Sequence, residues 1–78
     1  MKVKLAGIRQ IPISGEHIRL DALLKFTSVV STGGEAKILI QDGEVFVDGN
    51  KCTMRGKKIR PGNVVRFGEN IFLVKRAT

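Results

Sequence analysis

Apolar residues fall at helical spacing early in the chain. Leu20, Leu23 and Leu24 follow the i, i+3, i+4 pattern of an amphipathic helix, and Lys25 is directed away from them. This pattern predicts a first helix over residues 20–28.

The segment TGGEAKILIQDG predicts a second helix directly after the first. Thr32 followed by Glu35 is a capping box, in which both side chains accept hydrogen bonds from free backbone N–H groups at a helix start. Gly43 stands where a helix end in the left-handed conformation favours glycine. With these ends, the helix is about ten residues long. Its expected buried stripe consists of Ala36, Leu39 and Ile40.

Alternating apolar residues and turn dipeptides replace the helical pattern in the second half. Val45 and Val47 share one face of a predicted strand, and the following Asp48-Gly49 is a strong signal for a hairpin turn. Later turns at PG and at GEN separate two further predicted strands, NVVRF and IFLV.

The N-terminal segment supports two interpretations. Residues 3–13 are rich in aliphatic and β-branched side chains, but Gly7 and Pro12 disfavour a central strand. Residues 1–13 are therefore expected to form either a short edge strand of the domain or an extended arm.

This order of elements predicts an α+β fold, with two short helices grouped before a small, mostly antiparallel sheet. A chain of 78 residues has room for one small hydrophobic core. Because 42% of the residues are hydrophobic and recur in patterned blocks, a folded domain over residues 1–78 is expected rather than a disordered chain.

Charge narrows the class of partner. Fourteen Lys and Arg oppose seven Asp and Glu, for a formal net charge of +7, which favours a polyanion such as nucleic acid. The alternative is a basic surface that serves only solubility. The distribution of charge favours binding, because KCTMRGKKIRPGNVVRF, residues 51–67, contains six cations and no acid. Such cations repel one another, and phosphate contacts relieve that repulsion.

Catalysis, metal binding and disulfides receive no support from the sequence. His17 and Cys52 are the only residues of their types, and no catalytic constellation or zinc-ligand spacing is visible. We therefore predict a protein that is not an enzyme, with no cofactor or metal, in which Cys52 is a small core side chain. With no apolar signal or membrane-length segment, the mature protein is expected to be the whole chain, cytoplasmic and without a membrane partner.

Two local features leave alternatives open. Gly33-Gly34 before the second helix is either a phosphate cradle, with Lys37 beside it, or a plain capping turn. Phe46 alternates to the face opposite its neighbouring valines, so it is either exposed for stacking or packed under the N-terminal arm.

Aromatic content favours one kind of nucleic acid. Single-strand binders stack bases on aromatic side chains, but this chain has no Trp or Tyr, and Phe26, Phe67 and Phe72 are expected in the core. Recognition through backbone charge and helix shape is therefore expected, as for double-stranded or structured RNA.

Several motifs together resemble the S4 RNA-binding domain family over residues 18–67. They are RLD at the first helix, Ala-x-x-Leu-Ile-x-x-Gly through the second, Val-x-Val-x-Gly in the hairpin and Pro-Gly-x-x-Val near the end. The segments GGEAK and RGKKI are similar to those of small stand-alone bacterial S4-like proteins. The resemblance implies an S4-like (alpha-L) fold, in which RNA lies across the exposed helix faces and the basic hairpin beside them.

The resemblance also implies functional residues. Arg19 and Lys37 match positions that face RNA phosphates, and the cationic segment of the stand-alone group is matched by Arg55, Lys57 and Lys58. Charge and pattern alone add Lys25, Lys51 and Arg60 to this predicted RNA-binding set. One departure is that many S4 domains begin the second helix with Ser-Arg, where this chain has Thr32-Gly33. The arginine is missing, which shifts the expected RNA contacts to Lys37 and residues 55–60.

The leading hypothesis is a monomeric, non-enzymatic RNA-binding protein that grips structured RNA, ribosomal RNA among the candidates. A module that binds an acidic protein surface through Phe46 and the basic face is the second hypothesis. Binding to double-stranded DNA is a third, disfavoured because no recognition-helix pattern is present.

Overall fold

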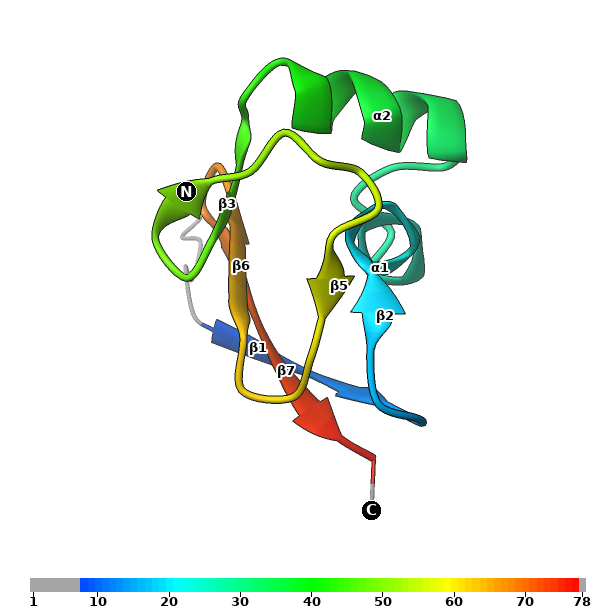
Figure 1. Cartoon of the computed structure of the whole chain (residues 1–78), viewed down its shortest axis with the longest axis vertical. Coiled ribbons are helices and arrows are strands. Elements are labelled where there is room, and N and C mark those ends of the chain that lie inside the picture. Colours follow the sequence, from blue (N-terminus) through cyan, green and yellow to red (C-terminus); the bar gives the residue numbers. More distant parts are fainter. Residues whose placement is uncertain (1–7, 78) are drawn as a thin grey trace, which may run out of the picture.

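In the described part of the chain, two helices, a five-stranded sheet and a separate two-stranded ladder surround one core (Figure 1). The computed structural model describes residues 8–77. The elements in chain order are β1 (Ile8–Ile13), β2 (Ile18–Arg19), α1 (Leu20–Phe26), α2 (Gly33–Gln41), β3 (Val45–Val47), β4 (Asn50–Lys51), β5 (Lys58–Ile59), β6 (Val64–Phe67) and β7 (Asn70–Arg76).

The large sheet is mixed. Its strand order is β1-β7-β6-β3-β4, and β1 runs parallel to β7 while the other three neighbouring pairs are antiparallel. The expected α+β class with a mostly antiparallel sheet is confirmed, and the one parallel pair makes the sheet mixed. Residues 8–13 form an edge strand of the domain, where Pro12 is tolerated because an edge leaves one side of the strand without partners. The rest of the predicted arm, residues 1–7, lies outside the described residues.

The β2–β5 ladder was not predicted, and it joins distant parts of the chain. Ile18 lies opposite Ile59, and Arg19 lies opposite Lys58. Each strand has only two residues, so neither carries the period-two pattern by which strands are recognised.

The turns follow their sequence signals. Asp48 and Gly49 both have positive φ, 52° and 87°, as the favoured two-residue hairpin turn between β3 and β4 requires. The Asp48 carboxylate also accepts hydrogen bonds from Asn63 Nδ2 at 2.8 Å and from the Val64 N–H at 2.9 Å. One side chain therefore ties the hairpin to the start of β6.

Helix α2 begins and ends as predicted. Thr32 Oγ1 accepts a hydrogen bond from the Glu35 N–H at 3.1 Å, and Glu35 Oε1 accepts one from the Ser31 N–H at 2.7 Å. At the other end, Gly43 has φ 78° and donates its N–H to the Ile40 carbonyl at 3.1 Å. The predicted capping box and glycine end thus enclose a helix of nine residues.

Helix α1 is shorter than predicted, and Phe26 was wrongly placed in the core. The buried stripe continues from Leu20 to Thr27 at i+7, so Phe26 lies beside it and is 60% exposed. The helix ends at Phe26 rather than near residue 28, because Ser28 has φ 66° and cannot continue it.

Both helices pack on the sheet through one cluster of buried side chains. Phe72 is fully buried and Phe67 is partly buried against this cluster, which agrees with their predicted place in the core. The cluster comprises Ile11, Ile13, Leu20, Leu23, Leu24, Val30, Ala36, Ile40, Val45, Val47, Ile59, Val65, Phe72 and Val74.

Candidate nucleic-acid interface

The basic segment between β4 and β5 is fastened to the start of α1 by its backbone. Helix α1 has no side-chain cap. Instead, the Leu20 N–H donates to the Lys57 carbonyl at 2.9 Å, and the Asp21 N–H donates to the Arg55 carbonyl at 3.1 Å. Two N–H groups that a helix start leaves without partners are thus satisfied by residues 55–57, which places these cations beside α1.

The β2–β5 ladder brings two further cations together. Arg19 and Lys58 lie directly opposite one another and are exposed, while Ile59 faces the core. Like charges opposite one another in a ladder destabilise the pair, and an anion bound between them would relieve this.

A buried carboxylate lies at the centre of these cations. Asp21 is only 7% exposed, and its Oδ1 accepts from Arg19 Nε at 3.2 Å while its Oδ2 accepts from Arg55 Nε at 3.0 Å. Burial by itself raises the pKa of Asp21, but the hydrogen bonds from Arg55 and Arg19 and the charge of Arg19 outweigh it. The pKa of this carboxyl therefore lies below its ordinary value of 3.8.

Arg55 also reaches the start of α2. A Cβ atom placed on Gly33 would lie 3.7 Å from Arg55 Nη2, so the guanidinium group lies directly beside this glycine. Lys37 follows Gly33 by four residues and therefore occupies the same face of α2. A cation is thus present at the start of α2 although residue 33 itself is a glycine.

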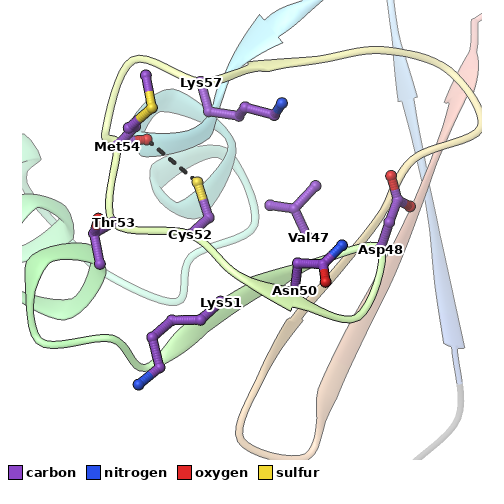
Figure 2. Close-up of a pocket in the computed structure, with 8 residues that line it drawn as sticks. All are labelled: Val47, Asp48, Asn50, Lys51, Cys52, Thr53, Met54 and Lys57. Carbon is purple, nitrogen blue, oxygen red and sulfur yellow. Dashed lines mark hydrogen bonds between the residues drawn. The ribbon is translucent and has the colours of Figure 1, made fainter.

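A shallow hollow of about 330 Å³ lies between the β3–β4 hairpin and the segment that leads to β5 (Figure 2). Lys57 extends over this hollow, and Lys51 leaves it toward the end of α2. Cδ of Lys51 comes within 3.1 Å of where a Cβ on Gly43 would stand, and a cation is favourable at a helix C-terminus. Cys52 is partly buried against the core, in line with its predicted role as a small core side chain.

The structure brings together five of the eight predicted RNA-binding residues. Two of the others are not included in this group: Lys25 is exposed in the last turn of α1, and Arg60 is exposed in the turn after β5. Within residues 8–77, neither side chain forms a hydrogen bond or an ion pair that joins it to the other predicted residues. Lys51 lies across the hollow from Lys57 (Figure 2). We call the remaining five the basic cluster: Arg19, Lys37, Arg55, Lys57 and Lys58.

Sequence reasoning missed Asp21. The signal was present, because an acid two residues after Arg19 inside a basic surface is a candidate ion-pair partner.

The surroundings of Phe46 match the prediction only in part. Phe46 is half-buried on the face opposite Val45, as predicted, but the guanidinium group of Arg66 lies over its ring at 4.4 Å. Residues 1–7 of the N-terminal arm, which were the other candidate cover, lie outside the described residues.

No group of three or more His, Cys, Asp or Glu in residues 8–77 is arranged to hold a metal ion. None of the described helices is both long and apolar enough to cross a lipid bilayer.

Comparison with protein families matches residues 11–75 to the S4 domain. The chain belongs to the S4 domain family. A curated relative of this S4 domain is the probable ribosome maturation protein RlbA of Bacillus subtilis (strain 168). It is 38% identical over 57 residues, which cover 73% of this chain and 80% of that protein. A second relative is the small ribosomal subunit protein uS4 of Novosphingobium aromaticivorans, which is 31% identical over 51 residues, or 65% of this chain and 25% of that protein.

Proposed function

We propose that this S4 domain is a non-enzymatic protein that binds structured RNA through the basic cluster. The observation that carries the proposal is the convergence of five cations from four segments, β2, α2, the segment before β5 and β5 itself, at the start of the two helices. Cations gathered on one face of a folded surface repel one another unless a polyanion lies across them. Family membership supports RNA as that polyanion.

We propose further that the RNA belongs to the ribosome or to one of its precursors. Two relatives with ribosomal names support this, one a probable maturation protein and the other a subunit protein. The relation to the first is the stronger argument, because the match covers most of both chains. The protein would act as a small binding module on folded RNA, by phosphate contacts rather than by base stacking.

Crosslinking in cells, followed by sequencing of the bound RNA, tests this proposal. Wild-type protein is compared with a Lys37→Ala/Lys57→Ala/Lys58→Ala variant and with a control, Arg66→Ala/Lys75→Ala/Arg76→Ala, that loses the same charge outside the basic cluster. We expect enrichment of ribosomal or precursor RNA with wild type and the control, and its loss in the first variant.

Recovery of no RNA by the wild-type protein would contradict the proposal. In that case an acidic protein surface becomes the leading partner, and co-purification that survives RNase treatment would identify it.

A further inference from the structure

We propose that Arg19 and Arg55 form a clamp for a single phosphodiester group of the RNA backbone, and that Asp21 is the residue that positions both arginines. This inference rests on the proposed RNA-binding function, and it goes further by naming one phosphate site and assigning a role to an acidic residue within a basic surface.

The hydrogen-bonding capacity of Asp21 is used entirely by the protein. Oδ1 accepts from Arg19 Nε at 3.2 Å and from the Ala22 N–H at 2.8 Å, while Oδ2 accepts from Arg19 Nη2 at 3.2 Å and from Arg55 Nε at 3.0 Å. The Asp21 side chain is only 10% exposed. The carboxylate therefore faces the protein and its two arginines, and it does not present a negative surface to a ligand.

Both arginines keep donors that no described residue engages. Their side chains are 56% and 40% exposed for Arg19 and Arg55, and no hydrogen bond within residues 8–77 engages Nη1 of Arg19 or either terminal nitrogen of Arg55. Because one donor of each arginine contacts the same Oδ2 atom, the two guanidinium groups are close neighbours. Paired N–H groups of this kind match the geometry of phosphate oxygens.

Neighbouring charges complete the phosphate site. Lys58 lies opposite Arg19 in the ladder, and the Arg19 guanidinium group lies beside Gly56, where a Cβ would stand 3.6 Å from Nη2. Two arginines and one carboxylate leave an excess positive charge, to which Lys58 adds. The hydrogen bonds to Asp21 hold long side chains that are otherwise free to rotate, so less conformational entropy is lost when a phosphate binds.

This arrangement predicts a result opposite to that of simple charge counting. If Asp21 were only a negative charge in a basic surface, Asp21→Asn would strengthen the binding of RNA. If Asp21 positions the clamp, the same change weakens binding although the protein becomes more positive. The matched control is Asp42→Asn, which makes the same chemical change at an exposed acid at the end of α2.

The experiment measures the dissociation constant of each variant for an RNA hairpin of about 16 base pairs, by fluorescence anisotropy at fixed salt. We expect Asp21→Asn to weaken binding by about tenfold, because charge-assisted hydrogen bonds that orient the clamp are lost. Asp42→Asn is expected to bind as wild type does, or slightly more tightly. Equal or tighter binding by a folded Asp21→Asn variant would overturn the inference while leaving RNA binding intact.

A second pair of variants decides the question if Asp21→Asn does not fold. Arg55→Lys keeps the charge but cannot donate to Asp21 and to a phosphate with one planar group, whereas Arg76→Lys makes the same change at the far end of β7. We expect Arg55→Lys to bind about tenfold more weakly than wild type and Arg76→Lys to bind as wild type does. Equal dissociation constants for both would overturn the clamp. No measurable binding by wild type would instead overturn the proposed function and the clamp together.

Discussion

At the scale of single residues, Asp21 contributes to stability as well as to the proposed RNA contacts. Its pKa lies below the ordinary value of 3.8, because the hydrogen bonds from Arg55 and Arg19 outweigh the cost of burial. A carboxyl whose pKa is lower in the folded than in the unfolded protein stabilises the fold most at pH values above the unfolded pKa. That contribution is lost as the pH falls through the folded pKa.

We therefore expect Asp21→Asn to lower the free energy of unfolding by about 1–3 kcal/mol at neutral pH, since arginine donors lose a charged acceptor. The difference between wild type and variant should shrink as the pH falls below 3.8. Urea denaturation of both proteins over a series of pH values measures this difference, in which the effects of other carboxyl groups largely cancel. A difference that stays constant with pH would show that the charge of Asp21 is not what stabilises the fold.

The residues of the candidate interface were only partly predictable. Arg19, Arg55 and their neighbours stand out as cations in the sequence, but charge alone says nothing about the carboxylate that holds them. The contact between Asp21 and Arg55 joins residues 34 positions apart and depends on how the segment before β5 crosses α1. The prediction that Phe26 lies in the core was wrong for a different reason. The buried stripe of α1 passes to Thr27 and leaves Phe26 beside it.

At the scale of the elements, sequence motifs correctly predicted the caps and turns that depend only on residues close together in the chain. The capping box of α2, the Asp48-Gly49 hairpin and the Pro-Gly turn each satisfy their hydrogen bonds or φ angles within a few residues. The parallel pairing of β1 with β7 and the β2–β5 ladder were not predicted, because they join residues from opposite ends of the chain or strands of two residues. Pairings of this kind depend on the whole fold.

Helix α2 offers a test of these local signals. Thr32→Ala removes the side-chain acceptor of the Glu35 N–H and should lower the free energy of unfolding by about 1 kcal/mol. Ser31→Ala is the matched control: it removes a neighbouring hydroxyl, while the contact of residue 31 with Glu35 runs through its backbone N–H and remains. Thermal unfolding followed by circular dichroism compares the two variants. Equal stabilities would mean that packing against α1, rather than the cap, determines where α2 begins.

At the scale of the whole molecule, the cations behind the formal net charge of +7 are unevenly distributed over the surface. The fold gathers five cations into the basic cluster, where the backbone of residues 55–57 and the carboxylate of Asp21 hold two segments in place. Arg66 and Arg9 instead lie over the rings of Phe46 and Phe72. If the basic cluster is the RNA-binding face, the number of phosphates it contacts is set by its five members and not by the total charge.

The dependence of RNA affinity on salt measures that number. With about five phosphates neutralised on an RNA duplex, the logarithm of the association constant should fall against the logarithm of salt concentration with a slope of roughly −4 to −5. Lys57→Ala/Lys58→Ala removes two of the five cations and should flatten the slope by about two units while weakening binding to all sequences alike. Lys75→Ala/Arg76→Ala removes an equally adjacent pair at the end of β7 and should leave the slope unchanged. A wild-type slope near zero would contradict binding through phosphates. Equal slopes for the two variants would mean that RNA responds to the overall charge of the molecule and not to the face on which the fold assembles it.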